Sequence, residues 1–190
     1  MTTNYTDNDL TLYDLSKNTA KKLQDGNNPN TVALTDKKAI VGNKASNTIT
    51  IFDLASDKKT TLSDIGLSPT DSVVLDELKK VFVTMAGSNE VSVIDYTTEK
   101  LVKKIPVGKR PVHIYIAPHK EDFHVKHEGE IPEIFVANDD GDSISIIDSE
   151  KLEVKSTLQV GKGHHKLAFV NNKVYISNIK DNTVSIFNRK

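Results

Sequence analysis

Short stretches of alternating apolar and polar residues recur along the whole chain. Two and four residues before a repeated anchor position the side chain is always aliphatic, and three residues before it stands Thr or Ser. The anchors are Asp14, Asp53, Asp95, Asp148 and Asn188. Alternation with period two is the pattern of a β-strand with one apolar face. We therefore expect a strand to lead into each anchor.

The anchors are spaced by 39, 42, 53 and 40 residues, and other residues keep the same register. Six residues before each anchor stand Asn8, Asn47, Asn89, Asp142 and Asn182. Ten residues before it stand Asn4, Asn43, Met85, Asn138 and Asn178. A glycine recurs with spacings of 40, 42 and 53 residues, as Gly26, Gly66, Gly108 and Gly161. Turn-forming residues at fixed offsets indicate that one structural unit is repeated.

Each unit has room for four short strands, which in the third unit are VSVIDY, LVKKIPV, VHIYIAP and EIFVAN. Units of about 40 residues with four strands match a β-propeller blade. A β-sandwich would not require the same turn residues at the same offset. We therefore predict an all-β fold, a single propeller domain over residues 1–190 with about four blades. Its units are 9–47, 48–89, 90–142 and 143–182, and 183–188 is one extra strand.

Both ends of the chain are expected to lie inside a blade. Residues 1–4 read as the remnant of an inner strand, and Thr183 to Asn188 matches Leu10 to Asp14. Three interpretations stay open: a closed four-bladed ring with a redundant strand, a fragment of a longer propeller, and a half-ring that a second copy completes. An open arc exposes apolar faces and strand edges. The sequence therefore predicts self-association or missing blades.

Composition narrows the classes of partner. The chain has 25 basic and 26 acidic residues and a formal net charge of −1, which argues against a broad electrostatic grip on nucleic acid or an anionic membrane. It has no cysteine, so disulfides, thiolate nucleophiles and zinc–thiolate sites are excluded. No segment reaches the roughly 18 apolar residues of a membrane span, and the first residues have no features of a signal peptide.

The repeats also resemble a known family. Segments such as IFVANDDGDSISIID, VFVTMAGSNEVSVID and VYISNIKDNTVSIFN are similar to the YVTN-type β-propeller repeats of surface-layer and exported bacterial and archaeal proteins. The resemblance covers nearly the whole chain. It implies an extracellular, cell-surface or periplasmic location. The family usually closes with about seven blades, and it includes both scaffolds and propellers that hold redox cofactors.

Ligands usually bind propellers where the innermost strands begin. In this chain those strands follow the recurrent glycine, and their first residues should ring one channel mouth: 29–31, 69–71, 111–113 and 164–166. The ligand or metal candidates there are His113, His164, His165, Asp71 and Lys166. Neutral imidazoles can ligate a divalent metal or haem iron. The alternative is a polar rim in a water-filled channel.

A second candidate metal site lies in an insertion. The third unit has a longer loop between Ala117 and Ile134, and its candidate ligands are His119, His124, His127 and Glu128. Histidines three residues apart can converge on one ion. A solvated loop of mixed charge explains the same residues without a metal. This loop is expected on the face opposite His113, about 20 Å away at about 3.3 Å per strand residue.

Two functions remain open on the residues, and analogy of fold alone adds a third, a lyase that uses a channel histidine as its base. The first is a non-catalytic binding or scaffold module that presents a rim or channel mouth to a protein, peptide or glycan. The second is a metal- or haem-binding propeller with a redox role that uses the channel-mouth histidines. No GxSxG, HExxH or phosphate-loop motif is present.

Overall fold

The computed structural model describes residues 1–56, 58–118 and 131–189, which form five antiparallel sheets. The first sheet has three strands, β1 (Thr2–Asn4), β2 (Asp9–Asp14) and β3 (Thr19–Gln24). The second has four, β4 (Pro29–Leu34), β5 (Lys38–Asn43), β6 (Thr48–Asp53) and β7 (Lys59–Leu62). The third has β8 (Pro69–Leu75), β9 (Lys80–Met85), β10 (Glu90–Asp95) and β11 (Lys100–Pro106).

The last two sheets complete the described chain. The fourth has β12 (Pro111–Ile116), β13 (Ile134–Asn138), β14 (Ser143–Asp148) and β15 (Glu153–Gln159). The fifth has three strands, β16 (His164–Val170), β17 (Lys173–Asn178) and β18 (Thr183–Asn188). The described helices are two 3-10 turns, η1 (Asp76–Leu78) and η2 (Asp139–Gly141). None of the helices in the described ranges has the length and apolarity to cross a membrane.

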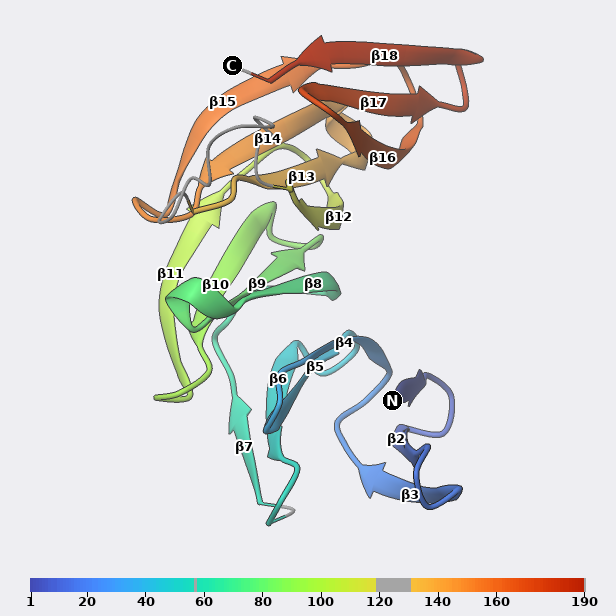
Figure 1. Ribbon diagram of the computed structural model, residues 1–190, viewed down its shortest axis with the longest axis vertical. Coiled ribbons are helices and arrows are strands. Elements are labelled where there is room, and N and C mark those ends of the chain that lie inside the picture. The colour runs from blue at the N-terminus through green and yellow to red at the C-terminus, as the bar shows by residue number, and fades with distance from the viewer. Residues whose placement is uncertain (57, 119–130, 190) are drawn as a thin grey trace.

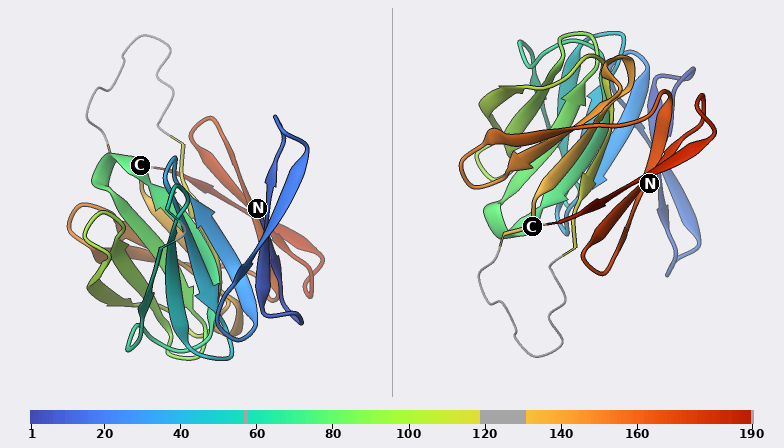
Figure 2. Two further views of the ribbon diagram at one scale, coloured as in Figure 1. Left: turned by 90° about the horizontal axis from the view of Figure 1, so that it is seen from below. Right: turned by 90° about the horizontal axis from the view of Figure 1, so that it is seen from above.

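The sheets follow one another around an open arc (Figure 1). Strands β4, β8 and β12 lie side by side on the concave side, and β7, β11 and β15 lie on the convex side. This is the predicted all-β, blade-like architecture, and the closed four-bladed ring is not what forms. Each sequence unit divides between two sheets, because the strand pair around an anchor ends one sheet and the next pair begins another. Figure 2 shows the sheets stacked face to face.

The hydrophobic core consists of the layers between consecutive sheets. One cluster joins Ile49 and Ile51 of the second sheet to Val81 and Val83 of the third, and equivalent clusters fill the other three spaces. The aliphatic residues four positions before the first four anchors, Leu10, Ile49, Val91 and Ile144, are all fully buried. The alternating pattern therefore marks the side chains that are removed from water between two sheets.

Buried asparagines explain two of the recurrent positions. Asn43 and Asn138 are fully buried, and each donates through Nδ2 to two hydroxyls on the neighbouring strand. For Asn138 the acceptors are Oγ of Ser143 at 3.2 Å and Oγ of Ser145 at 2.9 Å. The recurrent glycine lies against this amide, because a Cβ on Gly108 would stand 2.5 Å from Nδ2 of Asn138. The buried asparagine therefore requires a glycine at the position that packs against its amide.

The aspartate anchors accept hydrogen bonds in the turns that follow the strands. Oδ1 of Asp53 accepts the backbone N–H groups of Ala55 and Ser56, and the same pattern recurs at Asp14, Asp95 and Asp148. Such hydrogen bonds favour the ionised carboxylate. The bonds from Ser56 hold the pKa of Asp53 below its ordinary value. The four aspartate anchors are therefore turn-forming residues.

The residues six positions before the anchors have positive φ, between 42° and 58°: Asn8, Asn47, Asn89, Asp142 and Asn182. Asn and Asp adopt this left-handed conformation more easily than most residues. Oδ1 of Asn47 also accepts the backbone N–H of Ser68 at 2.7 Å, and Oδ1 of Asn89 accepts that of Arg110 at 2.8 Å. These two bonds tie the turns at Asn47 and Asn89 to the starts of β8 and β12.

Replacement of Gly108 by alanine tests the fit between glycine and amide. The new Cβ would overlap the side chain of Asn138, so we expect Gly108→Ala to lower the free energy of unfolding by about 1–3 kcal/mol. The cost should fall in an Asn138→Ala background, where the space is free. Urea denaturation of the two single variants and the double variant measures this coupling. Gly141→Ala is the control, because the atom nearest to its new Cβ would be the backbone nitrogen of Lys109 at 3.2 Å and not the Asn138 amide. An equal cost of Gly108→Ala in both backgrounds would contradict the explanation.

Replacement of Asp148 by asparagine tests the turns through pH. The backbone N–H of Lys151 is the main cause that lowers the pKa of Asp148 from its ordinary 3.8, against the opposing effect of burial. The stabilisation is present above pH 3.8 and is lost as the pH falls through the lowered pKa. We expect Asp148→Asn to be less stable at pH 7 and to lose less of its stability between pH 7 and pH 3. Thermal unfolding at both values measures this, and Glu150→Gln should keep the wild-type profile.

Candidate ligand-binding site on the inner strands

The inner strands β4, β8, β12 and β16 begin at the predicted residues and share one irregular start. Their pairing with the next strand shifts register within the first few residues, between Pro29 and Thr31 in β4 and between Pro111 and His113 in β12. Each start follows a residue with positive φ: Asn28, Ser68, Arg110 and Gly163. The left-handed residue and the bulge turn the first side chains of the strand away from the regular pleat.

Hydrogen bonds connect the starts of neighbouring inner strands. Nδ2 of Asn30 donates to the carbonyl of Thr70 at 2.9 Å, and Oγ1 of Thr70 donates to the carbonyl of Pro111 at 3.1 Å. The hydroxyls of Thr31 and Ser72 lie 2.7 Å apart. Three sheets are therefore linked at this rim by side chains as well as by their apolar layers. Sequence reasoning placed these residues at the rim but did not find the links, because they join residues about 40 positions apart.

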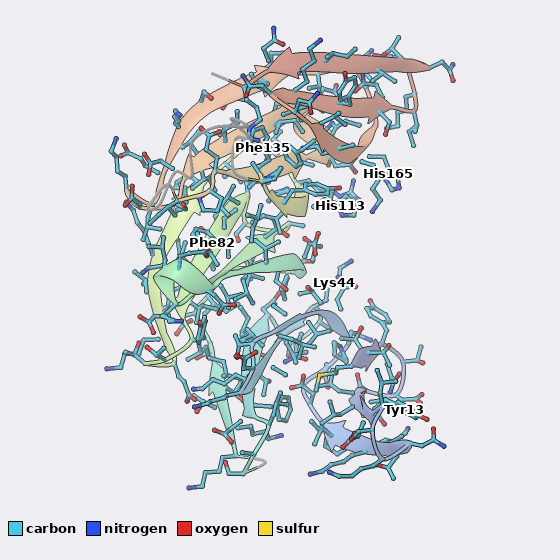
Figure 3. The ribbon with its side chains drawn as sticks, in the orientation of Figure 1. Tyr13, Lys44, Phe82, His113, Phe135 and His165 are labelled. Atoms are coloured by element: carbon cyan, nitrogen blue, oxygen red, sulfur yellow. The ribbon has the colours of Figure 1, made fainter. Side chains whose placement is uncertain are left out.

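Asp71, His113 and His165 come together from three consecutive sheets. Oδ2 of Asp71 lies 3.5 Å from Nδ1 of His113 and also accepts the backbone N–H of Ile114 at 3.2 Å. The rings of His113 and His165 meet edge to face with their centroids 5.6 Å apart. Figure 3 shows both imidazoles on the concave side. The side chains of Asp71 and His113 are about one-third exposed and His165 is exposed. A ligand on the concave surface can reach all three.

Tyr115 extends this group and was not found from the sequence. Its ring centroid lies 6.4 Å from that of His113. Its hydroxyl is buried beside the backbone of Leu167, and burial raises the pKa of Tyr115. A tyrosine two residues after a rim histidine points to the same side of a strand. That spacing is the signal that could have included it.

His164 does not join the exposed pair. Its side chain is 2% exposed, and both ring nitrogens are buried without a hydrogen-bond partner. It pairs with Asn178 as Pro29 pairs with Asn43 and Pro111 with Asn138, so it occupies the position of a buried proline. Burial lowers the pKa of His164 and favours the neutral ring. Lys166 is exposed, and its backbone N–H donates to Oγ of Ser177 at 3.3 Å.

The metal hypotheses have different outcomes. Within the described ranges no group of three or more His, Asp or Glu side chains is arranged to hold an ion. His113 and His165 therefore offer two imidazoles, with the Asp71 carboxylate beside the first. His119, His124, His127 and Glu128 lie outside the described residues, so the insertion-loop site stays a prediction.

A pocket between the second and third sheets is a further feature that sequence reasoning missed. It measures about 620 Å³ and is lined by Asp36, Lys38, Asp76 and Tyr96, among others. The Tyr96 hydroxyl donates to Oδ1 of Asp76 at 2.6 Å, and burial together with this bond raises the pKa of Tyr96 to about 12. The tyrosine directly follows the anchor Asp95. Its hydroxyl contacts a carboxylate twenty residues away, which only the fold brings near.

Comparisons with known proteins show the fold. Hydrazine synthase of Kuenenia stuttgartiensis matches 91% of this chain over 50% of its own, with 16% identity and a TM-score of 0.74. A functionally unknown protein from Desulfotomaculum acetoxidans DSM 771 matches 97% over 64%, with 16% identity and a TM-score of 0.70. The dihydro-haem d1 dehydrogenase NirN, solved in complex with DHE, matches 97% over 40%, with 15% identity and a TM-score of 0.72.

The chain has a β-propeller-type fold, as these structures do. It spans between 40% and 64% of the length of the structures described above. No protein-family model matches the sequence. No curated protein matches it either. Identities near 16% establish the fold alone, so function must be argued from this chain's own residues.

Replacement of His164 by proline tests its assignment to a proline position. Burial lowers the pKa of His164 below its ordinary 6.5, so the unfolded chain binds a proton more readily than the folded chain. The neutral ring therefore favours the folded state at pH values above about 6.5, and this stabilisation is lost as the pH falls from about 6.5 through the folded pKa. We expect His164→Pro to raise stability at pH 7.5 by about 0.4–1 kcal/mol and to reduce the loss between pH 7.5 and 5.5. Thermal unfolding at both values measures this. His165→Gln is the control, and a less stable variant with an unchanged pH profile would contradict the assignment.

Proposed function

We propose that this chain is a non-catalytic binding module that presents the concave rim of its inner strands to a protein, peptide or glycan partner. The observation that carries the proposal is the meeting of Asp71, His113 and His165 from three sheets on one exposed surface. Carboxylate and imidazole groups together offer hydrogen-bond donors, acceptors and flat ring faces. Such a set suits a polar ligand with stacking surfaces.

The rigidity of the rim supports a role in binding. The links from Asn30 to Thr70 and from Thr70 to Pro111 hold the starts of β4, β8 and β12 in one arrangement before a ligand arrives. A preformed site loses less conformational entropy on binding than a mobile one. The balanced charge of the chain favours a partner without high charge density, so nucleic acid is not proposed.

The proposed location is the cell surface or another extracytoplasmic compartment. This rests on the resemblance of the segments around Asp95 and Asp148 to YVTN-type repeats, and membership of that family is part of the proposal. The concave surface carries the labelled side chains of His113 and His165 (Figure 3).

A second candidate function is the binding of a divalent metal or haem, and the contact between His113 and His165 favours it. Two imidazoles from neighbouring strands can share one ion or supply an axial ligand to a haem iron. Among the solved structures of similar fold is NirN, whose structure contains DHE. The residues fit an open two-imidazole site. The sealed ring of His164 would not contribute to it.

One set of variants distinguishes the two functions. The purified chain is applied to arrays of immobilised glycans and peptides, and in parallel its melting temperature is measured with Zn²⁺, Cu²⁺ or haem. For the first function we expect binding to one ligand class, weakened at least about tenfold in a His113→Ala/His165→Ala double variant, which corresponds to the loss of at least about 1.4 kcal/mol. For the second we expect a thermal shift or a haem absorption band that the double variant loses.

Lys151→Ala is the matched control, because this lysine is exposed on a turn of the fourth sheet away from the rim. It should bind as the unmodified chain does. Array binding that survives the double variant would place the ligand elsewhere and overturn the assignment of the rim. The absence of any array binding and of any metal or haem effect would overturn both candidate functions.

A further inference from the structure

The pocket between the second and third sheets lies at the far end of the inner strands from the rim. Strand β4 ends at Leu34, and the lining of the pocket begins at the next residue, Thr35. Strand β8 ends at Leu75, and Asp76 follows it in the lining. The volume of about 620 Å³ is within the usual range of small-molecule sites. None of the three residues that meet on the rim lines this pocket, so its ligand is independent of the rim.

A buried tyrosine fixes one carboxylate in the pocket. The ring of Tyr96 belongs to the apolar layer between the two sheets, and the residue is 7% exposed. Its hydroxyl donates to Oδ1 of Asp76 at 2.6 Å. Burial and this bond raise the pKa of Tyr96 to about 12, so the hydroxyl keeps its proton at physiological pH. The bond therefore stays formed and holds the Asp76 carboxylate in place.

A second carboxylate approaches the same hydroxyl from the other sheet. Asp36 lies in the turn between β4 and β5 and lines the pocket. Its negative charge, together with that of Asp76, contributes to the raised pKa of Tyr96. Two carboxylates that converge from different sheets create a region of negative potential, which attracts a cationic group.

Lysines from both sheets line the same pocket. Lys37 follows Asp36 in the second sheet, Lys79 ends η1 in the third, and both are exposed. The side chains of Asp36, Lys37 and Lys79 form no ion pair with another residue in the described ranges. Lys38 differs, because its Nζ lies 2.5 Å from Oε1 of Glu99, which neutralises its charge. The pocket thus offers charges of both signs that are not paired with one another.

The Glu99 carboxylate also joins the two sheets beside the pocket. It follows β10 of the third sheet and accepts hydrogen bonds from Nζ of Lys38 on β5 and from the hydroxyl of Thr60 on β7, both in the second sheet. The bond from Lys38 is the main cause that holds the pKa of Glu99 below its ordinary value. A pocket whose walls are linked in this way loses less conformational entropy when a ligand enters.

We propose that this pocket binds a small zwitterion that carries an ammonium group and a carboxylate, as an α-amino acid or a dipeptide does. The carboxylates of Asp36 and Asp76 receive the ammonium group, and Lys37 and Lys79 receive the carboxylate of the ligand. A ligand with a single charge is repelled by one of these two sets, whereas a zwitterion is attracted by both. The pocket therefore selects for the presence of both charges in one molecule.

The test measures the melting temperature of the purified chain with a panel of α-amino acids and dipeptides, each at about 10 mM. Compounds that raise it are titrated by calorimetry, and we expect at least one dissociation constant below about 1 mM. The methyl ester of that compound lacks the carboxylate, and its N-acetyl derivative lacks the ammonium group. Each derivative should bind at least about tenfold more weakly. Dipeptides carry the two charges farther apart, so their affinities distinguish a peptide from a free amino acid.

Variants of the lining locate the site. Asp36→Asn and Lys79→Gln should each weaken binding about three- to tenfold, because each removes one charge that the ligand contacts. Both side chains are exposed, so both variants should keep the melting temperature of the unmodified chain without ligand. Glu77→Gln is the matched control, because Glu77 is exposed on η1 beside Asp76 but does not line the pocket. It should bind as the unmodified chain does.

The His113→Ala/His165→Ala variant separates this pocket from the rim and should bind the same compound unchanged. Loss of binding in that variant would place the ligand at the rim and overturn the proposal. An ester or N-acetyl derivative that binds as tightly as its parent would also overturn it, because a single charge would then suffice. So would the absence of binding by every member of the panel at about 10 mM, or equal affinities of the unmodified chain, Asp36→Asn and Lys79→Gln.

Discussion

The structure depends on the need to keep both faces of each middle sheet away from water. On β6, Ile49 and Ile51 pack toward the third sheet, and Phe52 packs toward the first. One strand therefore contributes to two apolar layers, as expected of a side-chain repeat of two residues. Every sheet that stacks in this way presents the same kind of surface to the next one. The arc in Figure 1 is the result of repeating that contact.

This double burial also places polar groups in the core and requires partners for them. Thr50 and Ser145 lie between the aliphatic residues of their strands and are almost fully buried. A buried hydroxyl needs a hydrogen bond, and Asn43 and Asn138 supply it from the adjacent strand. The third sheet has Met85 at the asparagine position, and there the hydroxyl of Ser92 donates to the carbonyl of Ile65 instead. The buried hydroxyl is hydrogen-bonded in all three sheets, although its partner is an asparagine amide in two of them and a backbone carbonyl in the third.

The same stacking creates the candidate site. Strands β8 and β12 lie side by side and bring Asp71 to His113, and the ring of His165 from β16 meets that of His113. Hydrogen bonds link the starts of β4, β8 and β12. The candidate site therefore depends on the stacking of three consecutive sheets.

The sequence by itself determined the strands, the turns and the blade-like repeat, because these depend on local alternation and on residues that adopt a particular turn conformation. Thr183–Asn188 was predicted as a strand and forms one, and the inner strands begin where the recurrent glycine placed them. The tertiary structure alone decided which strands share a sheet and which rim residues meet. His113 and His165 belong to different sheets, and their contact depends on the angle between those sheets. His164, the neighbour of His165, is sealed in the core, because adjacent residues of a strand point to opposite faces and stacking buries one of them.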